Sequence, residues 1–239
     1  MHEPSFVVRG NDRDAQGRLR PEQLEQIVRV LQAPGFVLLP SDTAYSVAAW
    51  LDTAEIRRNI NTMLKRSDNP ISLAFPSMDL VREWTEPNRI AEGLLKRFAP
   101  GPITVVCRAS RLIPDEVAEE AWGSQNRTLG VRIPNSTEER QVAEAGRIPV
   151  TTVAVRDDSD AGVTSFAKAM EIVQAGVARI GGAQWCAIEG EIDSSGLTST
   201  VIEILDDDGN HGMIRGNGPI SPDDLRACIA ELLQEAAEG

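Results

Sequence analysis

The sequence predicts an α/β fold, in which helices alternate with strands that are buried on both faces. Residues 21–33 carry apolar side chains at helical spacing, and residues 35–40 follow directly as a continuous apolar run. The same order recurs at residues 54–65 and 71–75. Hydrophobic residues make up 41% of the 239 residues and charged residues 25%, which is typical of a folded protein. A chain of this length is expected to form one large domain, or a domain with appendages.

The first two helices are predicted from the spacing of their apolar residues. Leu24, Ile27 and Leu31 share one face of residues 21–33, together with Val28. A proline stands at the start of this helix and a glycine just past its end, where helices accept them. In the second helix isoleucines recur at helical spacing, and a threonine at position 53 is the candidate N-cap.

The remaining elements follow from the same signals. Ser136 and Glu139 have the S-x-x-E spacing of a capping box, in which each side chain accepts a hydrogen bond from the other residue's backbone amide. Residues 1–20 carry few apolar side chains and are expected to be an extension that packs weakly. We expect helices at 88–98, 165–176 and 221–233, and strands at 103–109, 129–134, 148–155, 198–205 and 211–216.

Composition excludes several classes of protein. The 36 acidic and 24 basic residues give a net charge of −12, so binding to nucleic acid would need a local basic concavity. No apolar run approaches the ~20 residues of a membrane helix, and the first residues lack the order of a secretory signal. We therefore expect a cytoplasmic protein without membrane contact. Cys107, Cys186 and Cys228 are widely spaced and are expected to be buried, small side chains.

Several common catalytic motifs are missing from the sequence. His2 and His211 are the only histidines, so a serine–histidine triad or a histidine-based metal site is not expected. Neither G-x-x-x-x-G-K-[ST] nor G-x-G-x-x-G occurs. The aspartates at 157–160 and 206–208 are interpreted as solvated turns, and we expect no metal site. A reaction here would rely on positioning and electrostatic stabilisation, as attack on an activated phosphate does.

Polar side chains gather at four predicted strand ends, where ligands of open α/β sheets bind. Hydroxyl groups can orient an anionic ligand, and guanidinium groups bind phosphate or carboxylate, so a phosphorylated ligand is expected. The same residues also have ordinary structural interpretations, such as an Asx turn, a helix end or an ion pair. The four segments are residues 41–43, residues 65–70, residues 151–152, and residues 198–200 with Arg215.

Six short motifs in a fixed order resemble the YrdC-like family, which includes the threonylcarbamoyl-AMP synthases and their YciO-type relatives. The motifs are PSDTAYS at 40–46, KRSDNP at 65–70, PGPITVV at 100–106, LGVRIP at 129–134, STVIEI at 199–204 and IRGNGPIS at 214–221. Each motif is weak alone, but their order over residues 21–230 is specific. The resemblance implies a single domain at 21–239, with a twisted mixed sheet flanked by helices around an open, positively lined cavity.

The resemblance also implies an activity. In catalysing members the cavity holds ATP, threonine and bicarbonate, and forms threonylcarbamoyl-AMP and pyrophosphate for a later tRNA modification. The implied cofactor is therefore ATP, with or without Mg²⁺. By resemblance the amino acid or bicarbonate would be oriented by Ser41, Asp42, Thr43, Tyr45 and Thr152. At the first of these positions the family has threonine, so the hydroxyl is kept and a methyl group is lost.

Catalytic and nucleotide contacts carry over with two departures. Lys65 and Arg66 would neutralise phosphate charge. An alignment without a gap places Lys65 at the position of the family's arginine and Met63 at that of its lysine. An alignment with one gap instead places Lys65 at the position of the lysine. Val153 and Val155 replace the serine and the asparagine of the family's S-A-N motif. Each polar contact that a buried ligand group loses in this way costs ~1–3 kcal/mol. By resemblance the nucleotide-binding residues are Lys65, Arg132, Ala154, Ser199, Thr200 and Arg215.

These departures leave three hypotheses open. The first is a threonylcarbamoyl-AMP synthase-like enzyme, and the altered nucleotide wall places it nearer the YciO-type branch. The second is a non-catalytic protein that binds double-stranded RNA or tRNA through the same cavity, which the acidic bulk charge weakens. The third is a carbamoyl-AMP-handling module that works with a partner enzyme.

Overall fold

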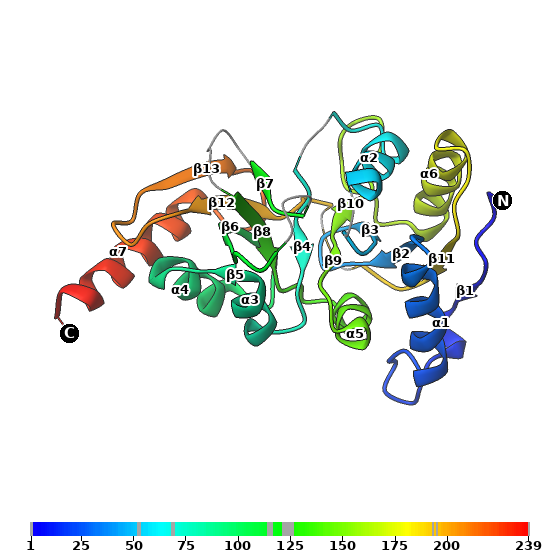
Figure 1. Ribbon diagram of the computed structural model, residues 1–239, viewed down its shortest axis with the longest axis horizontal. Helices are drawn as coiled ribbons and strands as arrows, with labels where there is room; N and C mark the ends of the chain where they lie inside the picture. The colour runs from blue at the N-terminus through cyan, green and yellow to red at the C-terminus, as the bar shows by residue number, and fades with distance from the viewer. Residues whose placement is uncertain are drawn as a thin grey trace.

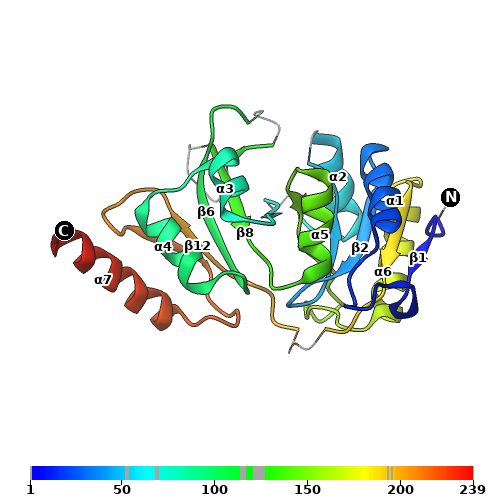
Figure 2. The same cartoon turned by 90° about the horizontal axis from the view of Figure 1, so that it is seen from below.

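Two mixed β-sheets lie side by side along the long axis of the molecule (Figure 1). A five-stranded sheet forms the half that carries the N-terminus, and an eight-stranded sheet forms the half that carries the C-terminus (Figures 1 and 2). The computed structural model describes residues 2–51, 54–67, 70–113, 117–120, 127–192, 194 and 196–238.

The five-stranded sheet is covered by helices on both faces. Strand β2 pairs with β11 in parallel and with β3 antiparallel, so the sheet is mixed. The strands, in spatial order, are β1 (Val7–Val8), β11 (Trp185–Ile188), β2 (Phe36–Pro40), β3 (Tyr45–Ala48) and β10 (Val153–Ala154). The covering helices are α1 (Pro21–Gln32), α2 (Ala54–Met63), α5 (Thr137–Gly146) and α6 (Phe166–Arg179).

Strand β2 shows why this sheet needs two helix layers. Phe36 and Leu38 belong to the hydrophobic cluster that also contains the buried side chains of α2 and α6. Val37 and Leu39 belong to a second cluster, which contains those of α1 and α5. Because successive side chains of a strand point to opposite faces, a run with no polar position fits a strand with helices on both sides. The prediction for residues 35–40 is confirmed.

The eight-stranded sheet is flanked by α3 (Met78–Trp84), α4 (Arg89–Phe98) and α7 (Pro222–Glu238). Helix α4 packs against α7 and β6 through buried side chains such as Leu94 and Leu225. Strand β6 pairs with β12 in parallel and with β8 antiparallel. In spatial order the strands are β13 (His211–Arg215), β12 (Thr200–Ile204), β6 (Ile103–Ala109), β8 (Arg127–Arg132), β4 (Leu73–Ala74) and β9 (Val150–Thr151), while β5 (Thr85–Glu86) pairs with β6 and β7 (Glu119–Glu120) with β8.

The chain crosses from one sheet to the other at Thr151 and Thr152. Thr151 belongs to β9, the last strand of the eight-stranded sheet. It also bonds to the chain of the other sheet, since its backbone amide donates to Ala49 O at 2.8 Å and its hydroxyl donates to Val47 O at 3.1 Å. Thr152 N donates to Ser72 O at 3.0 Å, and β10 then begins in the other sheet. The predicted strand at 148–155 is therefore divided in two.

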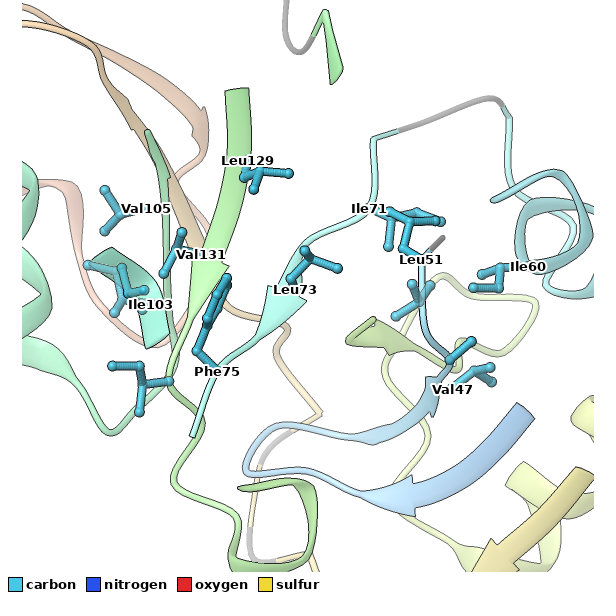
Figure 3. Packing of buried hydrophobic residues seen from close by; sticks show 14 of the residues in the cluster. Val47, Leu51, Ile60, Ile71, Leu73, Phe75, Ile103, Val105, Leu129 and Val131 are labelled. Atoms are coloured by element: carbon cyan, nitrogen blue, oxygen red, sulfur yellow. The ribbon is translucent and has the colours of Figure 1, made fainter. Parts of the chain in front are cut away.

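One hydrophobic cluster continues across this junction. Figure 3 shows Val47 and Ile60 on the side of the five-stranded sheet and Val105 and Val131 on the other, with Leu73 between them. All five side chains are buried. The two halves are therefore held together by shared apolar packing as well as by backbone hydrogen bonds.

The expectation that residues 1–20 pack weakly is wrong. Val7 and Val8 form β1, which adds a parallel strand to β11. Val8 and Leu19 are each only 3% exposed and belong to the cluster beneath α1. Arg13 forms an ion pair with Glu138 of α5. Residues 1–20 pack against the domain with few apolar side chains, because the parallel edge strand β1 and one part-buried ion pair also hold them in place.

Several short elements were not expected from the sequence. These are β3, β11 and α3, whose lengths of four to seven residues give too little periodicity to recognise. The proposed N-cap Thr53 lies outside the described residues. Cys107, Cys186 and Cys228 are buried, as predicted. In the part of the chain that the structure describes, every helix is too short or too polar to cross a bilayer.

Candidate functional site

A cavity of about 850 Å³ is lined by residues from both sheets and from α2 and α6. Its polar lining comes from the loop after β2, the end of β8, the junction between β9 and β10, and the segment before β12. Eight of the residues predicted from the sequence line it: Thr43, Lys65, Arg66, Arg132, Thr152, Ala154, Ser199 and Arg215. Side chains separated by up to 172 positions in the sequence therefore surround one hollow.

Four of the predicted residues do not line the cavity. The Tyr45 hydroxyl is used within the fold, since it donates to Gly190 O at 2.5 Å and accepts from Gly190 N at 3.0 Å. Burial raises the pKa of Tyr45. The Thr200 hydroxyl likewise donates to Ile220 O at 2.7 Å and accepts from Ile220 N at 3.2 Å. Of the other two, Asp42 binds Arg132, which lines the cavity, and Ser41 donates to Glu139, which does not.

Arg132, at the end of β8, is held by a carboxylate from the other sheet. One of its Nη atoms donates to Asp42 and, at 3.3 Å, to the hydroxyl of Thr43. The second oxygen of Asp42 accepts from the backbone amide of Asn135 at 2.9 Å. The Nε of Arg132 is buried and has no hydrogen-bond partner among the described residues. The guanidinium of Arg132 is therefore fixed in the cavity wall by its contacts with Asp42 and Thr43.

Further basic side chains line the cavity, among them Arg66, Arg156 and Arg215, together with the acidic side chains of Asp157, Asp158, Asp160 and Glu171. Burial first, and then the like charges of Arg156, Arg66 and Arg132, lower the pKa of Arg215 from 12.5 to about 10. Both Arg156 and Arg215 donate to the hydroxyl of Thr198. Arginines forced this close repel one another, so a bound anion would relieve the repulsion.

Arg156 was missed by the sequence analysis. It lines the cavity directly after β10, and its guanidinium also pairs with Asp160 at 2.7 Å. Its position just beyond the strand predicted at 148–155 was the available signal, since ligands of α/β sheets lie beyond strand ends. The aspartates at 157–160 follow it closely, and such a run is typical of a solvated turn, so the arginine was not considered.

The segment that carries Lys65 and Arg66 is fixed from α6. Arg179 donates to Met63 O at 2.5 Å and to Thr62 O at 3.2 Å, which caps the end of α2. Lys65 adopts a left-handed backbone with φ 53°, and Arg66 N donates to Asn61 O at 2.8 Å. The register of this segment against the family pattern stays open. Residues 68 and 69 lie outside the described part of the chain.

The wall formed by β10 carries apolar side chains, as the sequence suggested. Val153 is 5% exposed and Val155 is fully buried, and both belong to the hydrophobic cluster. Ala154 lines the cavity between them. Neither valine can offer a hydrogen bond to a ligand, so this wall contacts a ligand through backbone and methyl groups alone.

Glu139 is a second residue that the sequence analysis misassigned. Ser136 Oγ accepts from Glu139 N at 3.2 Å, which confirms half of the predicted capping box. The other half is wrong, because the Glu139 carboxyl group turns inward and accepts from Ser41 Oγ at 2.5 Å. Glu139 is fully buried behind the cavity wall, and burial raises its pKa. The S-x-x-E spacing hid this residue, since it has an ordinary role at helix starts.

The fold and the cavity define an α/β protein with a polar cavity, lined by several arginines, between two mixed sheets. A family model described as "Telomere recombination", that of the Sua5, YciO and YrdC proteins, matches residues 29–215. The chain belongs to this family.

Three comparisons illustrate the relationship. A putative threonylcarbamoyl-AMP synthase of Methanocaldococcus jannaschii is 25% identical over 136 residues, or 56% of this chain and 61% of the relative. The chain thus spans less than two thirds of that relative. The structure of E. coli YciO matches with a TM-score of 0.72 at 15% identity, covering 89% of this chain and 95% of YciO. P. abyssi Sua5 complexed with L-threonine matches with a TM-score of 0.66 at 20% identity, covering 98% and 76%. The two structures support the fold.

Proposed function

We propose that this protein is an ATP-binding enzyme of the threonylcarbamoyl-AMP synthase type. It would convert threonine, bicarbonate and ATP to threonylcarbamoyl-AMP, pyrophosphate and water, the first step toward threonylcarbamoyl modification of tRNA. The observation that carries the proposal is the depressed pKa of Arg215 in a cavity shared with Arg66, Arg132 and Arg156. The basic side chains that line this cavity outnumber the acidic ones, which favours a polyanion such as a triphosphate.

The reaction needs little covalent chemistry from the protein. The threonine amine combines with bicarbonate to give a carbamate and water, and a carbamate oxygen then attacks the α-phosphorus of ATP. The bond from the α-phosphorus to the bridging oxygen breaks, and pyrophosphate leaves. Such a step is accelerated by holding the reactants in line and by neutralising phosphate charge. This agrees with a site that has arginines and hydroxyls but no histidine.

The charged groups divide between two ends of the cavity in this proposal. Arg66, Arg156 and Arg215 would bind the leaving pyrophosphate, with Lys65 at the exposed rim. Arg132, which also lines the cavity, would bind the amino-acid carboxylate or the carbamate. Mg²⁺ would arrive on the nucleotide phosphates, since the described residues include no group of three carboxylate, histidine or cysteine side chains suited to a metal ion.

Because Val153 and Val155 are apolar, we expect this enzyme to bind ATP weakly. A nucleotide here would lack two side-chain hydrogen bonds, each worth ~1–3 kcal/mol when the partner group is buried. We therefore expect a high KM for ATP, and we expect Val153→Ser to lower that KM because it returns a hydroxyl to the cavity lining.

The test is release of pyrophosphate from ATP with threonine and bicarbonate, with the adduct identified by mass spectrometry. Reactions that omit threonine or bicarbonate are the controls, and they should release no pyrophosphate above background. Pyrophosphate release that is independent of threonine would point to a different acceptor. No release at millimolar ATP would reject the proposal.

A second candidate is a non-catalytic protein that binds double-stranded RNA or tRNA. The apolar wall favours it, because a nucleotide pocket under selection for ATP would be expected to keep polar contacts there. The net charge of −12 opposes it. Titration of a short RNA duplex at low and high salt decides the matter: affinity that falls steeply with salt supports RNA binding, and the absence of binding at low salt eliminates it.

A further inference from the structure

Thr198 joins two arginines that come from different sheets. Arg156 follows β10 of the five-stranded sheet, and Arg215 is the last residue of β13 in the eight-stranded sheet. Arg156 donates to the Thr198 hydroxyl at 3.0 Å through one Nη atom, and Arg215 donates to the same oxygen. All three residues line the cavity. One neutral hydroxyl therefore holds two like charges side by side.

The backbone on either side of this contact is fixed by two glycines. Gly162 N donates to Gly196 O at 3.1 Å, two residues before Thr198. A side chain has no room at this crossing, because a Cβ on Gly162 would lie 2.6 Å from Gly196 O. Gly162 also forms a β-bridge with Arg156. The contact between the glycines thus sets the distance between the backbone that carries Arg156 and the backbone that carries Thr198.

Asp160 neutralises this pair of arginines only in part. It forms an ion pair with Arg156 at 2.7 Å, but its side chain is 80% exposed, where such a pair is weak. Its effect on Arg215 is smaller still: burial and then Arg156 lower the pKa of Arg215, and the opposing effect of Asp160 is the least of the named causes. The two arginines therefore keep a net positive charge.

The other acidic side chains of the lining have partners elsewhere or face water. Asp157 accepts three hydrogen bonds from its own turn. Glu171 forms an ion pair with Lys168 at 3.0 Å on α6. Asp158 is exposed, so solvent screens its charge.

The two guanidinium groups have donors to spare. The Nε and the second Nη of Arg215 form no hydrogen bond within the described chain, and neither atom is enclosed by protein. The same holds for the Nε of Arg156. Because both groups bond one oxygen, they lie near enough to bond two oxygens of one phosphate group. A carboxylate has fewer oxygens and less charge, so it suits such a pair less well.

We propose that Arg156 and Arg215 form a clamp for a single phosphate group, and that Thr198 is the positioning residue that sets their spacing. The inference rests on the function proposed above, in which this group belongs to the triphosphate of ATP. Thr198 acts through the two arginines, and its hydroxyl gives each of them one fixed contact in the free protein.

Thr198→Val tests the positioning role, because it removes the shared acceptor and keeps the shape of the side chain. Thr198→Ser keeps the hydroxyl and is the rescue variant. Thr137→Val is the matched control, since Thr137 is exposed at the start of α5. Binding of inorganic pyrophosphate is measured by calorimetry. We expect about tenfold weaker binding by Thr198→Val, with Thr198→Ser and Thr137→Val like the wild type. Wild-type affinity in Thr198→Val overturns the positioning role.

Arg156→Met and Arg215→Met, alone and combined, test whether the arginines act as one clamp. If both bind the same phosphate group, each single variant should lose about tenfold in pyrophosphate affinity, and the double variant little more than either. In the Thr198→Val protein, Arg156→Met should then cost only about twofold. Single losses that multiply in the double variant would show that the arginines bind separate groups, and would overturn the clamp.

These results stand apart from the proposed activity. The expected pattern of binding without pyrophosphate release from ATP, threonine and bicarbonate would reject the synthase proposal alone. Pyrophosphate release with losses that multiply would reject the clamp alone. No binding of millimolar pyrophosphate by the wild type would also overturn the clamp.

Discussion

Arg132 at the end of β8 forms an ion pair with Asp42 in the loop between β2 and β3, so one buried pair joins the two sheets at the cavity. The side chains are 4% and 9% exposed. Asp42 therefore serves two purposes: it joins the two halves of the molecule, and it orients the guanidinium of a residue that lines the cavity.

Asp42→Asn should destabilise the protein by about 3 kcal/mol, because removing one partner leaves a buried charge uncompensated. Urea unfolding monitored by tryptophan fluorescence measures the change in the free energy of unfolding. Glu25→Gln is the control, since Glu25 pairs with Arg29 on the exposed face of α1 and both side chains are about 70% exposed. That variant should change stability by less than about 0.5 kcal/mol. Equal losses in the two variants would contradict the role given to Asp42.

The sequence was sufficient to predict most of the fold, because the strongest signals in it are local. The apolar run at residues 35–40 and the helical spacing at residues 21–33 each report one element, and both elements form as expected. The division of residues 148–155 between two sheets could not be predicted. It depends on Thr151 bonding to Val47 and Ala49, which are about 100 positions away.

The site was predictable where a residue's position at a strand end fixes its role. Thr152 and Arg215 were predicted in this way and Arg132 from the family resemblance, and all three line the cavity. Tyr45 and Thr200 were predicted from the same resemblance, but their hydroxyls are used within the fold. Glu139 could not be found, because only the folded structure brings Ser41 beside a carboxyl group that local spacing assigns to a helix cap.

Gly176→Ala should disturb the cavity from a distance. Helix α6 passes so close to the end of α2 that a Cβ at this position would lie 2.6 Å from Met63 O and would also clash with the Met63 side chain. The helices must separate, and Lys65 and Arg66 follow α2. We expect a loss of about 1–3 kcal/mol in stability and weaker binding of pyrophosphate.

Gly10→Ala is the matched control for this change, because a Cβ there meets no atom within 4 Å. Thermal unfolding with and without pyrophosphate measures both effects together. A Gly176→Ala protein with wild-type stability would show that α6 and α2 can separate freely. Helix α6 would then not fix the segment that carries Lys65 and Arg66.

Arg215→Met should have opposite effects on stability and on anion binding. Burial and the neighbouring arginines disfavour the charge of Arg215, so its removal should leave the free protein as stable as the wild type or more so. Pyrophosphate should bind about tenfold more weakly, because one charge-assisted contact is lost.

Arg226→Met makes the same charge change on the exposed face of α7, where Arg226 pairs with Asp223. It should bind pyrophosphate like the wild type in a thermal-shift titration. If Arg215→Met lowered stability and kept its affinity for pyrophosphate, Arg215 would be a structural residue, and the cationic site would lose its main support.

The buried carboxyl of Glu139 should make stability depend on pH in a defined direction. Burial raises its pKa in the folded protein above the ordinary value of 4.5, so the folded state binds the proton more tightly than the unfolded chain does. The stability contribution is therefore fully present below about pH 4.5 and is lost as the pH rises through the raised value. Glutamine does not titrate, so the stability of wild type relative to Glu139→Gln should fall across that window and then level off. Urea unfolding of both proteins from about pH 4 to pH 8 measures this difference. A difference that grew with pH would mean that Arg132 and the Ser41 hydroxyl outweigh burial, and that Glu139 is held as a stabilised anion.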